Sequence, residues 1–245
     1  MNTVNEDLSL VIPVYNEAVC LETNVGKILE YLKSVKMSYE VVLVNDGSTD
    51  STEAICQSIV KSNRSTRLIS YPVNRGKGYA VKTGMLESKG IYRLFMDADL
   101  AVPARFIQPC IRQLQEGADM VIGSRNFSKS SVKVPEGSLR RFLGGVYLRL
   151  VRRAFNLGVS DITCGLKGFE ENKAYNIFSR SKIERWGYDA EIIFLARKLG
   201  YNISEIPVDW YHSFDSKVKV ALDSVRTFIE MLQIYCNYRK GRYIL

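Results

Sequence analysis

The sequence predicts an α/β protein in which helices cover both faces of a mostly parallel sheet. The first half of the 245-residue chain alternates between short apolar runs rich in β-branched residues and segments whose apolar residues recur with a period near 3.6. Polar clusters follow these runs, as expected where parallel strands deliver their carboxyl ends to one edge of a sheet. The length suits one sizeable domain with a short appendage.

The first predicted strand is 8–15 ("LSLVIPVY"), and further strands are expected at 39–45, 66–71, 92–97 and 119–125. Asn16 is expected to cap the helix that follows the first strand. A second helix is predicted to begin within 46–60, and two more at 77–89 and 103–116. The apolar face of the helix after Asn16 is predicted to contain Val19, Val25, Ile28, Leu29 and Leu32.

The pattern changes after residue 125. From Arg125 to Arg153 there are eight basic residues and one acidic residue, Glu136, and apolar residues at helical spacing predict a basic amphipathic helix at 139–155. A helix is also predicted from Tyr188 to Leu199. A last amphipathic helix is predicted near the C-terminus, with a stripe formed by Ala221, Val225, Phe228, Leu232 and Tyr235.

The composition narrows the classes of partner and compartment. A net charge of +8 and a pI near 9.2 favour an anionic partner, which is a nucleic acid, a phosphorylated ligand or an acidic membrane. The sequence contains no recognised nucleic-acid-binding module, so we expect no nucleic-acid partner. The five cysteines form no C-x-x-C pair, which favours reduced thiols in a cytoplasmic protein. No apolar run approaches 18 residues, so we expect any membrane contact to be peripheral.

Two carboxylates follow the fourth predicted strand in "FMDADLAVP" (95–103). Asp97 and Asp99 lie two residues apart, so in an extended strand they would point the same way. Capping of a turn and of the next helix is one interpretation of this pair. The other is a site for Mg²⁺ or Mn²⁺, which bind one or two carboxylates and complete their shell with phosphates and water.

Two further strand ends carry groups suited to a nucleotide. In "NDGSTD", Asp46 offers an acceptor for a base N–H or a ribose hydroxyl beside a glycine turn, although a plain Asp-Gly turn is the alternative. In "NRGKGYAVKTG", Arg75 and Lys77 stand among glycines ahead of a helix, a suitable cradle for a diphosphate. Neither a Walker A loop nor a G-x-G-x-x-G motif is present, which disfavours simple kinases and dehydrogenases.

In order and spacing, "VIPVYNE", "NDGSTD", "NRGKGYAVKTG", "DADLAVP" and "GSR" resemble glycosyltransferase family 2, which has the GT-A (Rossmann-like) fold. Three later motifs, "DITCGLKGF" (161–169), "RWGYDAEI" (185–192) and "VDWYHSFDSKV" (208–218), resemble the polyprenyl-phosphate sugar transferases of that family, especially the dolichyl-phosphate β-glucosyltransferases. The resemblance covers nearly the whole chain. It implies a catalytic domain at 1–215, with a nucleotide-sugar half at about 1–125 and an acceptor half at about 126–215, followed by an amphipathic helix and tail at 216–245.

The resemblance implies transfer of glucose from UDP-glucose to a dolichyl or undecaprenyl phosphate, with inversion at the anomeric carbon. Asp97 and Asp99 match the D-x-D motif for metal and diphosphate, with Asp99 the more direct ligand, and Lys77 joins them at the diphosphate. Asn45 replaces the usual first aspartate of "DDGS", and Ala101 stands where mannosyl-phosphate synthases have a glutamine. The implied nucleoside contacts are Pro13, Tyr15, Glu17 and Asp46, with Arg75 near the diphosphate, and the implied acceptor-phosphate contacts are Arg125, Arg140 or Arg141, and Lys217.

The physical chemistry agrees with a phosphate acceptor. A phosphate monoester is already ionised near neutral pH, its second pKa being about 6, so it needs no general base to attack. The chain has a single histidine, His212, on which no acid–base scheme can rest. Three alternatives remain: another donor such as GDP-mannose or UDP-N-acetylglucosamine, a hydroxyl acceptor on a glycan, or a nucleotide-sugar-binding partner of a membrane complex without turnover.

Several residues keep two interpretations. Asp161 is either a turn residue or the residue that orients the acceptor-binding arginines. Asp189 and Glu191 are either carboxylates favoured at the start of a helix or residues of the site. Trp186 can stack on a sugar, whereas Trp210 suits core packing. The basic helix at 139–155 either buries its apolar stripe on the sheet or lies on anionic lipid. We expect it or the C-terminal helix to contact the cytosolic face of a membrane; the oligomeric state is not predicted.

Overall fold

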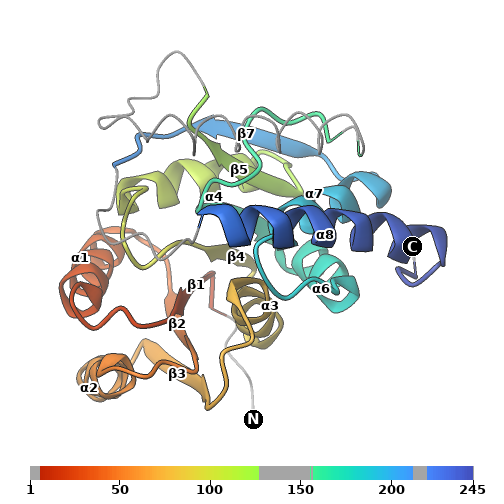
Figure 1. Cartoon of the computed structure of the whole chain (residues 1–245). Coiled ribbons are helices and arrows are strands. Elements are labelled where there is room, and N and C mark those ends of the chain that lie inside the picture. The colour runs from red at the N-terminus through yellow and green to blue at the C-terminus, as the bar shows by residue number, and fades with distance from the viewer. Residues whose placement is uncertain (1–5, 127–154, 156, 212–219, 245) are drawn as a thin grey trace, which may run out of the picture.

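The computed structural model describes residues 6–126, 155, 157–211 and 220–244 (Figure 1). In this part of the chain, seven strands form one sheet in the order β3-β2-β1-β4-β6-β5-β7. β1 pairs in parallel with β2 and β4, β2 with β3, and β5 with β7, whereas β6 is antiparallel to both β4 and β5. The predicted mostly parallel sheet is confirmed, with one reversed strand. The strands are β1 (Leu8–Val14), β2 (Tyr39–Asp46), β3 (Thr66–Tyr71), β4 (Tyr92–Phe95), β5 (Met120–Ser124), β6 (Lys167–Glu170) and β7 (Ile203–Pro207).

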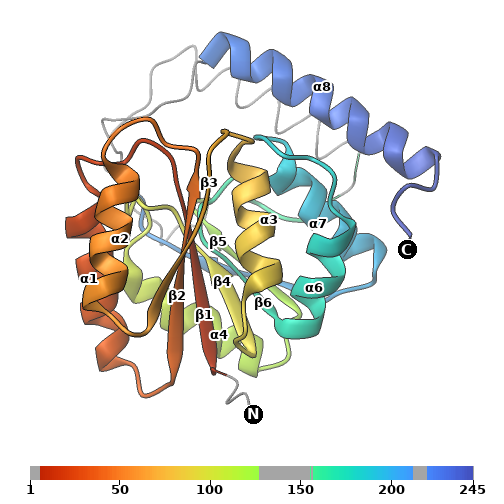
Figure 2. The same ribbon diagram turned by 90° about the horizontal axis from the view of Figure 1, so that it is seen from below.

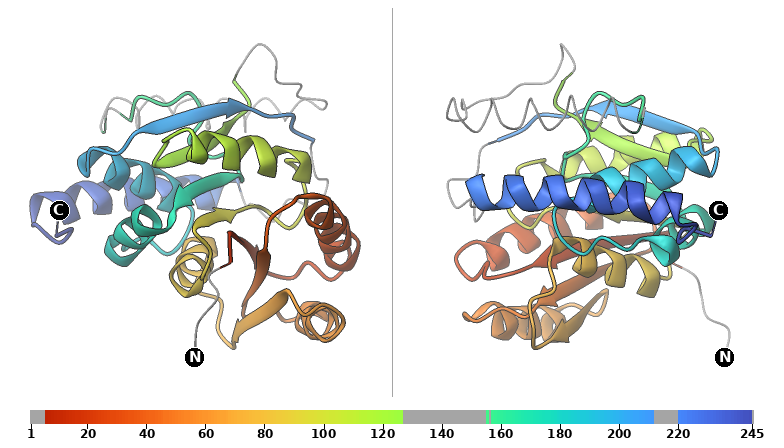
Figure 3. Two further views of the ribbon diagram at one scale, coloured as in Figure 1. Left: turned by 180° about the vertical axis from the view of Figure 1, so that it is seen from behind. Right: turned by 45° about the vertical axis from the view of Figure 1, so that its right-hand side comes forward.

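Helices cover both faces of the sheet, as predicted (Figure 2). One apolar cluster joins the strands to α1 (Leu21–Ser34), α2 (Thr52–Ser62) and α4 (Ile107–Gln115), which follows the short 3₁₀ turn η1 (Ala104–Phe106). A second cluster, on the other face, joins them to α3 (Lys77–Glu87), α6 (Glu171–Arg180), α7 (Tyr188–Lys198) and α8 (Val220–Arg239). Figure 3 shows the two layers from behind and from an oblique angle.

The central strands are buried on both faces because a helix layer lies on each side. Val11, Val42 and Val44 belong to the cluster under α3, whereas their neighbours Leu10 and Leu43 belong to the cluster under α1. Each of these side chains is fully buried. A near-continuous apolar run is what such a strand requires, and the runs in the sequence predicted it correctly.

Two local predictions were wrong. Asn16 does not cap α1: the helix begins at Leu21 after Cys20, and Val19 lies outside it, 91% exposed. Asn16 instead adopts a positive φ of 54°, and its Oδ1 accepts a hydrogen bond from the backbone N–H of Thr49 at 2.8 Å. Its side chain therefore ties the loop after β1 to the loop after β2, a long-range bond that local spacing does not reveal.

The fourth strand is shorter than predicted. β4 ends at Phe95, so Asp97 and Asp99 lie in the turn that follows, not in the strand. Strand alternation therefore does not set the directions of these two side chains.

Some predictions fall on residues that the structure leaves undescribed. The basic helix at 139–155 lies almost wholly outside the described residues, as do His212 and the side chains of Ala221 and Val225. The predicted C-terminal helix is present as α8. Of the helices that are described, none combines the length and the apolar character needed to cross a membrane. All five cysteines are described and are free thiols, in agreement with the sequence.

Candidate active site

The polar clusters of the sequence meet at one edge of the sheet. β1, β2 and β4 run parallel, and β5 runs in the same direction because both β4 and β5 are antiparallel to β6. Asp46 is the last residue of β2, and the loops that follow the other three strands carry Tyr15 and Glu17, Asp97 and Asp99, and Arg125. A ligand site at the carboxyl ends of the strands is the arrangement that this topology favours.

Asp97 is paired with a cation from a neighbouring element. Lys77 is the first residue of α3, and its Nζ lies 2.5 Å from Oδ1 of Asp97. The other side of the carboxylate rests on Gly165, where an added Cβ would lie 2.3 Å from Oδ2 of Asp97. Gly165 belongs to the segment "DITCGLKGF", so three sequence motifs converge on this one carboxylate.

Asp99 lies in a tightly held turn. Its Oδ1 accepts a hydrogen bond from the backbone N–H of Ala101 at 3.0 Å, and Asn24 of α1 donates to the carbonyl of Ala98 at 2.9 Å. Leu100 adopts a positive φ of 53°, which is costly for a branched residue and keeps the turn in a strained conformation. Burial and the charge of Asp97 raise the pKa of the Asp99 carboxyl above its ordinary value, with a smaller contribution from Glu17.

The donor set suits a divalent cation that completes its shell with ligand oxygens. Among the described residues, no group of three or more His, Cys, Asp or Glu side chains is arranged to hold a metal. Asp99 is nevertheless a half-buried carboxylate beside a second carboxylate, and both its partial burial and that neighbour destabilise its ionised form. A cation at that position relieves this cost. Two protein carboxylates with the remaining positions left to phosphate and water is the usual arrangement for Mg²⁺.

A second ion pair, which is buried, interacts electrostatically with the first. Lys167 of β6 is fully buried, and its Nζ contacts Oδ1 of Asp189 and donates to the carbonyl of Cys164 at 2.8 Å. Burial raises the pKa of Asp189 although Lys167 and Lys77 act in the opposite direction. Burial also acts to lower the pKa of Lys77, but the charges of Asp97, Asp189 and Asp99 outweigh it and raise that pKa. Asp189 therefore belongs electrostatically to the site, and Lys77 stays protonated.

The glycines around Lys77 make room for a distant segment of the chain. A Cβ at Gly76 would lie 2.7 Å from the carbonyl oxygen of Glu184, and one at Gly78 would lie 2.6 Å from Cβ of Tyr188. The backbone N–H of Tyr79 donates to the carbonyl of Glu184 at 2.9 Å. We call residues 184–188 the crossing segment. It packs on the turn that presents Lys77, a contact that sequence reasoning missed because the two parts lie about a hundred residues apart.

The crossing segment also carries two side chains into the site. Trp186 is partly exposed, and its ring centroid lies 6.0 Å from Nζ of Lys77. The carboxylate of Glu184 is ion-paired with the guanidinium of Arg75, which also stacks on Tyr79 with its Cζ 3.4 Å from the ring centroid. The structure thus brings Trp186 close to Lys77, while the charge of Arg75 is already paired with Glu184.

The carboxylate of Asp46 is occupied by the loop before α3. It is 3% exposed and accepts hydrogen bonds from the backbone N–H groups of Arg75 and Gly76 and from Nδ2 of Asn74, each at 2.8 Å. Its neighbour Asn45 bonds Ser70 and the backbone N–H of Ser48. These bonds place Asp46 as the residue that shapes the turn presenting Lys77.

The loop after β1 completes this side of the site. Pro13 lies in β1 and is half-buried, whereas Tyr15 is exposed. The backbone N–H of Glu17 donates to Thr52 at 2.7 Å, and its charge acts on Asp99. Of the four residues predicted to hold a nucleoside, Pro13 lies near the end of β1, Tyr15 and Glu17 lie on the loop that follows, and Asp46 ends β2.

Arg125 is held by the residue predicted to orient it. Its side chain makes a bidentate contact with Asp161, from Nε to Oδ2 at 2.7 Å and from Nη2 to Oδ1 at 2.9 Å, and its backbone N–H donates to the same carboxylate at 3.0 Å. Burial acts to raise the pKa of Asp161, but the contacts of Arg125 outweigh it and lower that pKa. Glu205 of β7 supports the turn by accepting from the backbone N–H of Ser160 at 2.9 Å. Trp210 lies beside Arg125, with 5.7 Å from its ring centroid to the guanidinium carbon.

The other predicted acceptor contacts are not described. Arg140, Arg141 and Lys217 lie outside the residues that the structure describes, so their relation to Arg125 stays a prediction.

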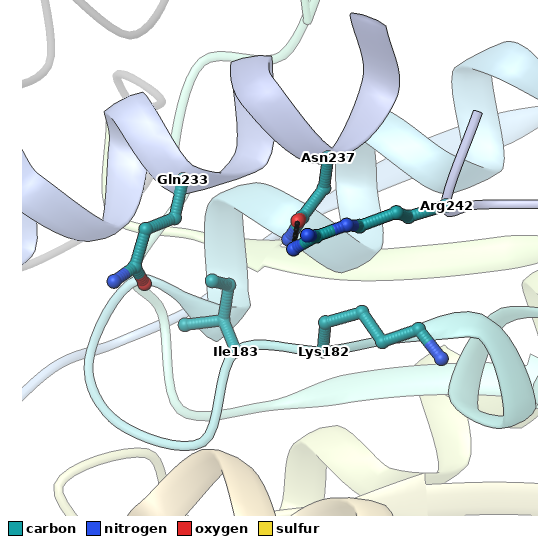
Figure 4. A pocket seen from close by; sticks show the side chains of 5 residues that line it. All are labelled: Lys182, Ile183, Gln233, Asn237 and Arg242. Atoms are coloured by element: carbon teal, nitrogen blue, oxygen red, sulfur yellow. Dashed lines mark hydrogen bonds between the residues drawn. The ribbon is translucent and has the colours of Figure 1, made fainter. Parts of the chain in front are cut away.

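A separate pocket of about 300 Å³ lies between α8 and the segment after α6 (Figure 4). Arg242 donates to Asn237 across it at 3.2 Å. None of the site residues described above lines this pocket, so it is no part of the site. Its lining consists of Lys182, Ile183, Gln233, Asn237 and Arg242.

Comparison of the sequence with known proteins identifies the family of this chain. The model of the family described as "Glycosyl transferase family 2" matches residues 9–178. The dolichyl-phosphate beta-glucosyltransferase of Dictyostelium discoideum is 33% identical over 246 residues, which covers 96% of this chain and 75% of that protein. The protein of the same name from Saccharomyces cerevisiae is 32% identical over 254 residues, covering 96% and 76%.

Solved structures confirm the predicted GT-A architecture. Glucosyl-3-phosphoglycerate synthase from Mycobacterium tuberculosis, crystallised with Mn²⁺ and uridine-diphosphate-glucose, superposes with a TM-score of 0.70 at 20% sequence identity. The match covers 95% of this chain and 79% of that one. At this identity the likeness extends to the fold.

Proposed function

The chain belongs to glycosyltransferase family 2, and we propose that it transfers glucose from UDP-glucose to a polyprenyl phosphate, giving a β-linked polyprenyl-phosphate glucose. One observation carries this proposal: Lys77, Asp97 and Gly165 meet at one point. Lys77 and Asp97 belong to motifs shared across the family, whereas Gly165 belongs to a motif of the lipid-phosphate branch. Residues from the motifs of the whole family and from a motif of the lipid-phosphate branch therefore form one site. The names of the relatives support the donor sugar and the acceptor class.

The donor is proposed to bind between the loop after β1 and the turn before α3. Pro13, Tyr15 and Glu17 line the nucleoside end, and Asp46 shapes the turn that presents Lys77. Lys77 remains cationic and faces the leaving diphosphate, where a fixed charge stabilises negative charge as it develops. Trp186 offers an aromatic surface for the sugar beside that lysine. Arg75, ion-paired to Glu184, holds the crossing segment in place.

Asp97 and Asp99 are proposed to hold Mg²⁺ or Mn²⁺. When bound, the ion supplies Lewis-acid neutralisation of the diphosphate. The protein's part is to hold Asp99 beside Asp97, where a cation would offset the raised pKa of the Asp99 carboxyl, and to place Asp97 between Lys77 and Gly165.

The acceptor phosphate is proposed to bind at Arg125. Asp161 fixes the guanidinium by a bidentate contact, and a planar fork of N–H donors suits a phosphate. The phosphate attacks without losing a proton, so its positioning replaces base catalysis. Arg140, Arg141 and Lys217 are proposed to join Arg125 on the acceptor side. The division into a nucleotide-sugar half at about 1–125 and an acceptor half at about 126–215 is part of the same proposal.

A donor and acceptor panel tests this function. Purified protein is given UDP-glucose, UDP-N-acetylglucosamine or GDP-mannose with a polyprenyl phosphate and Mg²⁺, and the labelled sugar is measured in the organic phase. We expect glucose alone to be transferred. Transfer from another donor would change the donor sugar that we propose and leave the proposed mechanism unchanged. Transfer to a polyprenol or a glycan hydroxyl, or binding of the nucleotide sugar without any product, would contradict the proposal.

A further inference from the structure

The outward face of α8 carries an exposed apolar stripe. Phe228, Leu232 and Tyr235 recur at the spacing that places side chains on one side of a helix, with Ile229 beside them. They are 43%, 49%, 52% and 48% exposed respectively. The opposite side of α8 is also apolar, because Met231 and Ile234 are buried in the cluster that includes α7. α8 is therefore apolar on two sides, although packing within the described fold accounts for one of them.

The charged side chains around this stripe are basic. Within the described stretch 226–244, Arg226, Arg239, Lys240 and Arg242 are exposed, whereas the one acidic residue, Glu230, is buried. Ile244, beyond the helix, is 80% exposed and adds to the apolar surface. Apolar side chains flanked by Arg and Lys form the composition that binds the headgroup region of an anionic bilayer.

The stripe lies on the side of the molecule that contains the site. In Figure 2, α8 crosses the side toward which β1 and β3 run, where the site residues follow the strand ends. α8 is also bonded to the site itself: Oε2 of Glu230 accepts a hydrogen bond from the backbone N–H of Gly187 at 2.7 Å. Gly187 is the neighbour of Trp186 in the crossing segment. Any surface that contacts α8 therefore lies at a fixed position relative to Lys77.

We propose that the outward face of α8, formed by Phe228, Ile229, Leu232 and Tyr235 with the basic residues Arg239 and Lys240, docks the protein on an anionic lipid bilayer. The proposal rests on the proposed function in one respect, since a polyprenyl phosphate acceptor is held in a bilayer. A second copy of this chain is the less suitable occupant, because the same face on both copies would bring basic residues together. A nucleic acid would leave the apolar stripe without a partner.

Sedimentation of the full chain with vesicles tests the proposal without donor or acceptor. Vesicles of phosphatidylcholine alone are compared with vesicles that also contain phosphatidylserine. We expect binding to the anionic vesicles, about 30-fold weaker for the double variant Arg239→Gln/Lys240→Gln, because each basic residue near such a surface contributes about fivefold in affinity. Phe228→Ser/Leu232→Ser should weaken binding by about tenfold or more.

Matched controls separate this face from general charge and apolar character. Tyr175 of α6 is as exposed as the stripe, and Lys33 and Lys36 are exposed basic residues near the end of α1. Tyr175→Ser and Lys33→Gln/Lys36→Gln should bind vesicles as the unaltered protein does. Absence of vesicle binding, equal binding by all variants, or loss of a dimer in place of vesicle binding would overturn the proposal.

Turnover distinguishes this proposal from the proposed function. With a short, water-soluble prenyl phosphate, the α8 variants should retain the rate of the unaltered protein, because their residues do not touch the site. A lower rate in the α8 variants would show that the outward face of α8 belongs to the active site and would contradict its role in docking. Vesicle binding without transfer of any sugar would remove the proposed function and leave the docking surface standing.

Discussion

Nζ of Lys77 lies 2.5 Å from Oδ1 of Asp97, so the first residue of α3 is ion-paired with the first carboxylate of the turn after β4. The pair places a fixed cation at the point where the leaving diphosphate is proposed to form. Asp97 also lies against Gly165, so a side chain added at Gly165 would displace the carboxylate.

Replacing Lys77 by methionine keeps the length of the side chain and removes its charge. We expect kcat to fall by about 10²–10³, the usual effect of deleting one preorganised electrostatic contact to a developing charge. The matched control is Lys61→Met on the exposed surface of α2, which should leave kcat unchanged. A Lys77→Met enzyme with normal kcat and only a raised KM would show that the lysine binds the donor without stabilising the leaving group.

Asp161→Asn removes the carboxylate that holds Arg125 and leaves a near-isosteric amide. The loss of the charged bidentate contact should lower kcat/KM by about 10²-fold, because the guanidinium is no longer fixed toward the acceptor. It should also lower the free energy of unfolding at pH 7 by about 2 kcal/mol. Steady-state kinetics and urea denaturation measure the two effects separately.

The same variant carries a pH dependence of known sign. Arg125 lowers the pKa of Asp161 in the folded protein, so the ionised carboxylate stabilises the fold above the unfolded pKa of about 3.9. That stability is lost as the pH falls through the lower folded pKa. The unaltered protein should therefore lose its higher free energy of unfolding, relative to Asp161→Asn, below about pH 4. A stability gap that is constant from pH 7 to pH 3 would show that the ion pair does not hold the arginine.

Gly78→Ala tests the packing of the crossing segment on the Lys77 turn. The new Cβ would lie 2.6 Å from Cβ of Tyr188 and 2.9 Å from two backbone carbonyl oxygens, which cannot move as a flexible side chain can. We expect a loss of about 1–3 kcal/mol in unfolding free energy together with reduced donor affinity. Gly26→Ala in α1 is the control, because nothing lies within 4 Å of its added Cβ. That variant should be stabilised by up to about 1 kcal/mol.

Glu230→Ala tests whether α8 positions the crossing segment. The variant leaves the buried N–H of Gly187 without its acceptor, so Trp186 should lose its fixed place beside Lys77. We expect the KM for UDP-glucose to rise by about tenfold, the loss of about 1.4 kcal/mol of binding. Glu230→Gln keeps an oxygen acceptor and should restore the KM. Equal KM values in both variants, with only a lower melting temperature in Glu230→Ala, would assign Glu230 to stability alone.

The sequence predicted what depends on short-range pattern. Buried runs such as 8–15 and 39–45 revealed the central strands, because a strand covered on both faces must be apolar throughout. The charged residues at the strand ends were also predicted, since parallel strands share one edge. The reversal of β6 was not predicted, because its four residues, Lys167–Glu170, include a lysine and a glutamate and carry no strand-like run.

What the sequence could not reveal depends on contacts between distant segments. Gly76 and Gly78 looked like a phosphate cradle, and in the structure they also admit the crossing segment. Asn16 looked like a helix cap, but its side chain bonds Thr49 thirty-three residues away. The contact of Asp161 with Arg125 was anticipated only as one of two interpretations, since a turn aspartate has no local feature that names its partner.

The chemical structure of the product formed from UDP-glucose and a polyprenyl phosphate tests the proposed function most directly. Purified protein is incubated with both and Mn²⁺, beside samples with EDTA and with Asp99→Asn, and the organic phase is analysed by proton NMR. The proposed function predicts a β-linked glucosyl phosphate that is absent from both control samples. An α-linked product, glucose released into water, or an unchanged yield in EDTA and in Asp99→Asn would contradict it.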